Sequence, residues 1–260
     1  MLKIHSCTVT CAGRFRENNE DNCYINGKFN EDVSLKSFQI TDKEIRKQYL
    51  YAVFDGLGGE KKGELASLTA AKILTDYQSS NIKNVIGDYI KTANKRICKI
   101  AKDYGCVTVG TTFVLLCISN KGKAVSYNIG DSRAYHYRSS VLKQISEDHT
   151  LSNRHLKMGF ITESEVDAHK DRHVLTQHLG IMPDEMIIEP YVSPEITPFN
   201  NDIFLLCSDG LTETLSNDEI YKILSLKEIN AEAYTYKLID KALSNGGKDN
   251  ITAMIIVISK

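Results

Sequence analysis

Hydrophobic and polar positions alternate with two different periods along this chain of 260 residues, which predicts both strands and helices. Apolar runs of strand length occur at 4–11, 22–26, 50–54, 110–118, 123–129, 134–137, 186–192, 203–208 and 251–258. Apolar residues at helical spacing predict helices over 66–77, 85–104, 216–226 and 230–244. Residues 150–182 have a more polar helical pattern, and 27–48 indicate no more than one irregular strand and a loop.

Local signals mark the boundaries of several of these elements. Thr162-Glu163-Ser164-Glu165 and Ser216-Asn217-Asp218-Glu219 both have the capping-box pattern of a helix start. Asn120-Lys121-Gly122 is typical of a turn between two strands. With only four prolines, no repeats and no break in composition, we expect one domain spanning residues 1–260. Strands that alternate with pairs of helices predict an α+β fold, with two packed sheets flanked by helices.

Charge and cysteine usage narrow the range of partners. The formal net charge of -1 argues against a polyanion-binding surface, so we expect no nucleic-acid partner. The seven cysteines form no C-x-x-C pair, and several lie in apolar runs, which favours a reducing compartment over a disulfide framework. No signal-peptide pattern is present at the start, and no apolar run approaches the roughly 18 residues of a membrane span. These features predict a cytoplasmic protein without a membrane partner.

Four aspartates stand at the ends of predicted strands. Asp55 follows the run 50–54 and precedes Gly56, where the missing side chain allows close approach to the backbone. Asp131 and Asp209 follow two further runs, and Asp249 lies just before the last one. We expect these residues to converge on one edge of a sheet, where clustered carboxylates repel one another unless cations bridge them. The sequence therefore predicts a metal site at this edge.

The expected ligands favour Mn²⁺ or Mg²⁺, because carboxylates and carbonyls are hard donors, whereas zinc usually binds His or Cys. Two such ions about 3.5–4 Å apart can bridge a water, lower its pKa and clamp a phosphate. The sequence lacks a cysteine-phosphatase loop, a G-x-S-x-G elbow, a Walker A loop and an H-E-x-x-H motif. If the chain is an enzyme, activated water is therefore the expected nucleophile.

Arg16 lies four residues before Glu20 and has two interpretations. Its planar donors suit phosphate oxygens, so it could hold a phosphate beside the metals. Alternatively, it is a surface arginine paired with an acid. Spacing alone does not decide between them.

Seven motifs occur in the order typical of a known family. They are Arg16-x-x-Asn19-Glu20-Asp21, Val53-Phe54-Asp55-Gly56-x-Gly58-Gly59, Gly110-Thr111-Thr112, Asn128-x-Gly130-Asp131-Ser132-Arg133, Asp148-His149, Ser208-Asp209-Gly210 and Asp249-Asn250-Ile251-Thr252. Over residues 5–258 the chain resembles the metal-dependent protein serine/threonine phosphatases of type 2C, in their compact bacterial form. The resemblance implies a sandwich of two antiparallel sheets flanked by helices and a dinuclear Mn²⁺ or Mg²⁺ centre. It also implies hydrolysis of phosphoserine and phosphothreonine in proteins by a metal-activated water.

The same resemblance implies roles for individual residues. Asp55 would bridge two metals. Glu20 and the Gly56 carbonyl would complete the coordination of one metal, and Asp209 and Asp249 that of the other. Asp21 would hold a metal-bound water, and Arg16 would hold the phosphate. A third, weaker metal would use Asp131 and Glu213, although Asp131 has a structural role in its turn as an alternative.

Two residues depart from the family pattern. Leu57 stands where several members have a histidine proposed as the general acid, so the proton for the leaving oxygen must come from another source. Glu213 stands where many members have aspartate, which leaves the geometry of the third site open. For His149 we expect a structural role. His173 and His178 lie in 150–182, which resembles the family's variable flap, and are expected at the surface unless they approach the substrate.

The principal hypothesis is therefore a phosphoprotein phosphatase whose partners are the phosphorylated substrates of a Ser/Thr kinase in signalling. The alternative is a regulatory module that binds phosphoproteins with little turnover, which Leu57 and Glu213 suggest. A hydrolase acting on nucleotides or nucleic acid is disfavoured, because the charge is near neutral and basic and aromatic residues are not interleaved.

Overall fold

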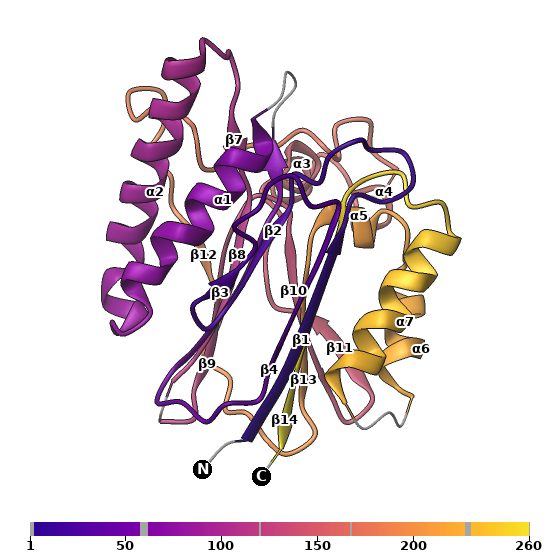
Figure 1. Cartoon of the computed structure of the whole chain (residues 1–260). Helices are drawn as coiled ribbons and strands as arrows, with labels where there is room; N and C mark the ends of the chain where they lie inside the picture. Colours follow the sequence, from indigo (N-terminus) through magenta and orange to yellow (C-terminus); the bar gives the residue numbers. More distant parts are fainter. Residues whose placement is uncertain (1–2, 58–61, 120, 167, 227–229, 260) are drawn as a thin grey trace.

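Two six-stranded antiparallel sheets stack face to face at the centre of the structure (Figure 1). The computed structural model describes residues 3–57, 62–119, 121–166, 168–226 and 230–259. The first sheet consists, in spatial order, of β11 (Val141–Gln144), β10 (Arg133–Arg138), β13 (Ile203–Cys207), β14 (Ile251–Ser259), β1 (Lys3–Cys11) and β4 (Ser37–Asp42). The second consists of β12 (Tyr191–Val192), β9 (Ala124–Ile129), β8 (Phe113–Ile118), β5 (Tyr49–Phe54), β2 (Asn22–Ile25) and β3 (Lys28–Phe29). A separate short pair joins β6 (Gly56–Leu57) to β7 (Gly110–Thr111).

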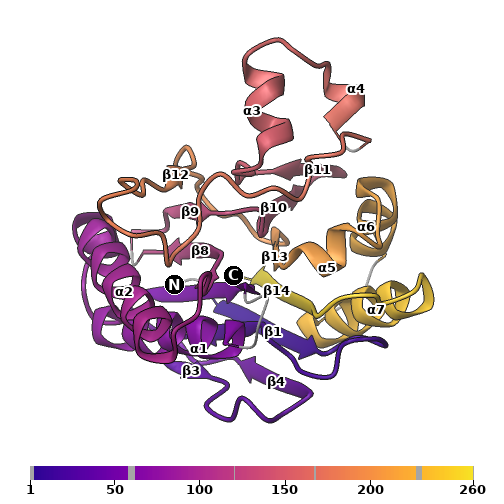
Figure 2. The same cartoon turned by 90° about the horizontal axis from the view of Figure 1, so that it is seen from above.

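Helices cover the outer faces of both sheets. α1 (Gly63–Leu74), η1 (Thr75–Tyr77) and α2 (Ile82–Tyr104) lie over the second sheet. α5 (Asp209–Thr212), α6 (Asn217–Leu224) and α7 (Ala231–Ser244) lie over the first. α3 (Leu151–Lys157) and α4 (Glu163–Val166) project beyond these layers (Figure 2). This arrangement confirms the predicted α+β fold of two packed sheets flanked by helices.

The continuous apolar runs of the sequence follow from burial on both faces of each sheet. In β5, Tyr51 and Val53 point into the core between the sheets, while Leu50 and Phe54 point toward α1 and α2. Successive side chains of a strand point to opposite faces, so a strand buried on both sides is apolar at every position. The central strand thus carries its final residues into a dry interior, and Asp55 follows where the strand ends.

Several predicted elements differ from the observed ones. The strand expected over 186–192 is wrong except for Tyr191 and Val192, because Pro190 has no N–H to donate and the preceding residues are largely exposed. The polar segment 27–48 contains two strands, β3 and β4, and the edge strand β11 was not predicted. Edge strands of this kind are half exposed, so they lack the apolar run that identifies a central strand.

Both capping-box candidates begin a helix, but only one makes the full set of bonds. At α6, the Ser216 hydroxyl accepts from the Glu219 N–H at 3.3 Å, and the Glu219 carboxylate accepts from the Ser216 N–H at 3.0 Å. At α4, the Thr162 hydroxyl instead donates to the Glu165 carboxylate at 2.7 Å. The turn predicted at 120–122 joins β8 to β9, where the Ser119 N–H donates to Lys123. Asn120, like the motif glycines 58 and 59, lies outside the described residues.

The first and last strands are neighbours. β1 pairs with β14 over nine residues, from Lys3 opposite Ser259 to Cys11 opposite Ile251. The two ends of the described chain therefore lie side by side at the same end of the sandwich (Figure 1). Among the described helices, none combines the length and the apolar character that crossing a membrane requires.

Candidate metal centre

The acidic residues singled out in the sequence meet at one end of the sandwich. Asp55 directly follows β5, Asp131 lies two residues after β9, Asp209 is the first residue of α5, and Asp249 lies two residues before β14. Asp55 and Asp209 are within hydrogen-bonding range of each other. The predicted edge of a single sheet is wrong, because Asp55 and Asp131 follow strands of the second sheet, whereas Asp209 and Asp249 adjoin strands of the first. The four aspartates meet because the two sheets are stacked.

The pKa values of these carboxyl groups show how unfavourable the cluster is without a cation. Burial, followed by the charge of Asp209, raises the pKa of both Asp55 and Asp131 well above the usual range. Burial also raises the pKa of Asp209. Desolvated carboxylates that face one another lack the water and counter-charges that would stabilise the ionised form. A divalent cation would supply that charge, and oxygen donors are its preferred ligands.

Asp21 has one oxygen engaged and one without a partner. Its Oδ2 accepts hydrogen bonds from Ser208 at 2.7 Å and from Thr252 at 2.6 Å. Its Oδ1 is buried and has no hydrogen-bond partner. Burial raises the Asp21 pKa to about 7, and the charges of Asp209 and Asp249 add to this effect. A buried acceptor without a partner is costly, so this oxygen is disposed to take a ligand.

Glu20 is held at the site by the amide of Asn250. The Asn250 side chain accepts from the Glu20 N–H at 2.8 Å and donates to the Asn18 carbonyl at 2.8 Å. The Ser67 hydroxyl of α1 donates to the Glu20 carbonyl at 2.6 Å. Burial and the neighbouring Glu64 raise the Glu20 pKa to about 7. Glu64 was not identified from the sequence, and its Oε2 is also buried without a partner.

Gly56 lies where its backbone passes very close to the Glu20 segment. A Cβ at this position would be 2.4 Å from the Glu20 carbonyl oxygen and 2.5 Å from that of Gly63. Only glycine permits this approach, which places the Gly56 backbone beside the acidic cluster.

Arg16 binds one of the predicted metal ligands. Its Nη2 lies 2.7 Å from Asp249 Oδ2, while 56% of its side chain stays exposed. Asp249 directly precedes Asn250, so Arg16, Glu20 and Asp249 form one connected group at the rim of the site. The interpretation of Arg16 as a surface arginine required an acidic partner. That partner is Asp249, which is itself a predicted metal ligand.

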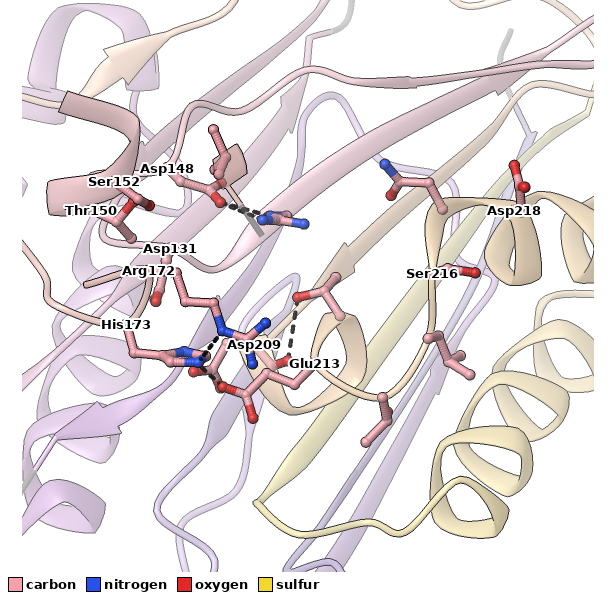
Figure 3. Close-up of a pocket in the computed structure, with 16 residues that line it drawn as sticks. Asp131, Asp148, Thr150, Ser152, Arg172, His173, Asp209, Glu213, Ser216 and Asp218 are labelled. Atoms are coloured by element: carbon pink, nitrogen blue, oxygen red, sulfur yellow. Dashed lines mark hydrogen bonds and ion pairs between the residues drawn. The ribbon is translucent and has the colours of Figure 1, made fainter. Parts of the chain in front are cut away.

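A cavity of about 480 Å³ opens beside Asp131 and Asp209, and residues of 150–182 form part of its wall (Figure 3). From that segment, His173 Nδ1 lies 2.9 Å from Glu213 Oε1, and Arg172 donates to His173 Nε2 at 2.6 Å. Burial and Asp209 raise the Glu213 pKa, which His173 and Arg172 oppose. His173 is exposed, as the sequence predicts, and it also contacts a candidate ligand of the third metal.

The other singled-out histidines have structural contacts. His149 Nδ1 accepts from the Gly130 N–H at 3.2 Å, and burial lowers its pKa. His178 packs against Gly110 and bonds the Leu179 carbonyl at 3.0 Å. Asp148 pairs with Arg133 at 2.6 Å, a pair that the sequence analysis did not identify. These contacts support the turns around the cavity.

Comparison with known proteins agrees with this architecture. The sequence model of the family described as Protein phosphatase 2C matches residues 5–155. The "Serine/threonine phosphatase stp" of Listeria innocua is 32% identical over 97% of this chain and 95% of its own length. The "Protein phosphatase PhpP" of Streptococcus pneumoniae is 30% identical over 97% of this chain and 96% of its own length. The chain therefore belongs to the protein phosphatase 2C family.

Solved structures extend the likeness to three dimensions. The serine/threonine phosphatase Stp1 from Staphylococcus aureus superimposes with a TM-score of 0.80 at 28% identity. The match covers 98% of this chain and 95% of that one. The resemblance drawn from the seven motifs is confirmed.

Proposed function

We propose that the acidic cluster is a dinuclear Mn²⁺ or Mg²⁺ centre at which a metal-activated water hydrolyses phosphoserine and phosphothreonine in proteins. The class itself, a metal-dependent protein serine/threonine phosphatase, follows from the family and its relatives. The proposal adds the residues, their roles and the number of ions. It rests chiefly on one observation, the convergence of buried carboxyls around an Asp21 oxygen that has no partner.

The roles assigned to these residues are those that the family resemblance implies, and the surroundings of each residue support them. The charges of Asp209, Asp21 and Asp131 all act on Asp55, which would be the ligand shared by two ions. The backbones of Gly56 and Glu20 approach each other closely, and the Glu20 carboxylate and the Gly56 carbonyl would bind one ion. Asp209 and Asp249 would bind the other. The charge of Asp209 acts on both Asp131 and Glu213, which would hold a third, weaker ion.

When bound, the two ions supply Lewis acidity, which lowers the pKa of water and offsets phosphate charge. The chain's own groups then position the reactants. Asp21, fixed by Ser208 and Thr252, orients the attacking water through its Oδ1. Arg16 exchanges its contact with Asp249 for phosphate oxygens, to which its planar donors are well matched. Leu57 has no proton to donate, so the leaving oxygen takes its proton from another group or from solvent.

The surroundings of the centre suit a protein substrate. The cavity is open and polar, and residues 150–182 form a flap along one of its walls. We expect the substrates to be proteins that an opposing Ser/Thr kinase has phosphorylated. We also expect residues 1–260 of this chain to form one catalytic domain. All seven cysteines are unpaired, which agrees with a cytoplasmic location.

The test is metal-dependent hydrolysis of a phosphothreonine peptide and of p-nitrophenyl phosphate, with Mn²⁺, Mg²⁺ or chelator. Asp55→Asn and Asp209→Asn should each lose Mn²⁺ binding together with about 10³-fold or more in kcat, since metal ions contribute several kcal/mol to such reactions. Asp218→Asn is the control, because Asp218 lines the same cavity at the start of α6, away from the cluster. Retention of Mn²⁺-dependent activity in both cluster variants would falsify the assignment. Wild-type protein that binds Mn²⁺ without turnover would favour the regulatory module.

A further inference from the structure

Outside the acidic centre, a second group of metal-binding side chains lies in the flap. His155, His169 and Asp171 each offer a ligand atom, and these atoms lie within 4.8 Å of one another. The three residues come from two separate segments: His155 belongs to α3, and the other two follow α4. All three side chains are half-buried.

We propose that this cluster is a site for a transition-metal ion of the Zn²⁺ class, distinct from the Mn²⁺ or Mg²⁺ centre. Two imidazoles and one carboxylate form a ligand set that zinc accepts with water in the fourth position. In a tetrahedral site with zinc–ligand bonds of about 2.1 Å, neighbouring ligand atoms lie about 3.4 Å apart. The present separations therefore require the side chains to close by little more than an ångström.

The geometry of the histidines favours a shared cation. The rings of His155 and His169 meet edge to face, with centroids 5.2 Å apart. His169 Nδ1 accepts a hydrogen bond from the Asp171 N–H at 3.1 Å and lies 3.9 Å from Asp171 Oδ2. The lone pair on this nitrogen is thus directed toward Asp171. A metal ion would compete with the N–H for that lone pair and draw in the carboxylate.

The outer part of the flap, residues 151–174, has little hydrophobic core to hold it together. Over the described residues of 151–174, no apolar side chain is fully buried, and only a few are half-buried. Met158, Phe160 and Val174 are exposed, and α3 and α4 project away from the sheets (Figure 2). Small units without a core are commonly stabilised by a metal or a disulfide. A bound ion would link α3 to the segment that continues into Arg172 and His173 at the cavity wall.

The experiment compares zinc binding by the full chain and its variants. The chelator-treated wild type, His155→Ala and His169→Ala are titrated with Zn²⁺ in equilibrium dialysis. The wild type should bind one equivalent more than either variant, because the carboxylate centre is common to all three. In both variants the affinity for this additional Zn²⁺ should fall more than about 100-fold. Loss of a residue that only supports a metal ligand costs about 10–100-fold, and loss of a ligand itself should cost more. Circular dichroism checks that each variant is folded.

His173→Ala is the matched control, because His173 is a flap histidine that belongs to a different cluster, with Asp209 and Glu213. It should retain the additional equivalent. Equal zinc counts in the wild type, His155→Ala and His169→Ala would overturn the proposal, and so would loss of the equivalent only in His173→Ala. As a second readout, Zn²⁺ should slow hydrogen exchange of amides 151–174 in the wild type and not in His155→Ala.

Discussion

Asp249 has two prospective partners, the Arg16 guanidinium that contacts it at 2.7 Å and the metal ion that the proposal assigns to it. Both interactions are electrostatic, and both use the same carboxylate. Because more than half of the Arg16 side chain is exposed, its contact with Asp249 is weak enough to be exchanged for another anion. A substrate phosphate between the metals and Arg16 is such an anion.

Replacement of Arg16 should therefore lower catalytic efficiency and leave the fold intact. For Arg16→Ala we expect kcat/KM to fall about 10–100-fold, since a hydrogen bond to a charged group contributes about 1.5–3 kcal/mol. Mn²⁺ affinity should be retained. The measurement is steady-state hydrolysis of the phosphothreonine peptide, with Arg14→Ala as the control at an exposed arginine nearby. A change of less than about twofold would support the surface-arginine interpretation.

For single residues, the sequence indicates which acidic side chains belong to the site but not which side chains hold them in place. Asp55, Asp131 and Asp209 could be predicted because each follows an apolar run. That they meet across two stacked sheets could not, because the runs do not say which strands share a sheet. The Asp21 contacts with Ser208 and Thr252 join residues more than 180 positions apart. No local pattern encodes such pairs. The same is true of His173 and Glu213, which meet only because the flap lies along the cavity.

Among the elements, the helix starts at α4 and α6 differ in how fully their capping boxes form. For Ser216→Ala we expect a loss of about 1 kcal/mol in the free energy of unfolding, because an orphan N–H of α6 loses its acceptor. Thr162→Ala should cost less, since the Thr162 hydroxyl donates to a carboxylate and caps no N–H. Urea unfolding of the two variants checks this order. Equal losses of stability in the two variants would contradict this prediction, because they would show that the different hydrogen bonds of Ser216 and Thr162 do not matter.

Element prediction succeeded where burial is two-sided and failed at the edges. The central strands β5, β8 and β13 are buried at every residue, so their apolar runs are unambiguous. β11 alternates between exposed and half-buried positions throughout, and so does the first half of β4. Their pairing depends on a neighbouring strand that the local sequence does not specify.

For the whole molecule, the acidic cluster should make stability depend on pH in a way that metal reverses. In the folded chain without metal, burial raises the pKa of Glu20 and of Asp21 to about 7. In the unfolded chain these groups titrate near pH 4. Because the folded pKa is the higher one, the stabilisation is full below about pH 4 and is lost as the pH rises through about 7.

The measurement is the urea midpoint in chelator at about pH 5.5 and about pH 8.5. We expect the urea midpoint to be lower at the higher pH. With Mn²⁺ the difference should shrink or reverse, since the ion binds the deprotonated carboxylates of the folded state. Asp21→Asn should flatten the dependence in chelator. A midpoint that rises with pH in chelator would contradict the assignment of Glu20 and Asp21 to the buried cluster.

The pairing of β1 with β14 has a consequence for how the protein is made. β14 lies between β13 and β1, so a nascent chain that has not yet reached it has two separate pieces in place of the first sheet. The same stretch of translation delivers Asp249 and Asn250, which secure Arg16 and Glu20. Contacts this distant in sequence form late, after the ribosome has produced nearly all of the described chain. The phosphatase should thus remain silent until β14 has been synthesised, and it should complete its centre and its first sheet in the same step.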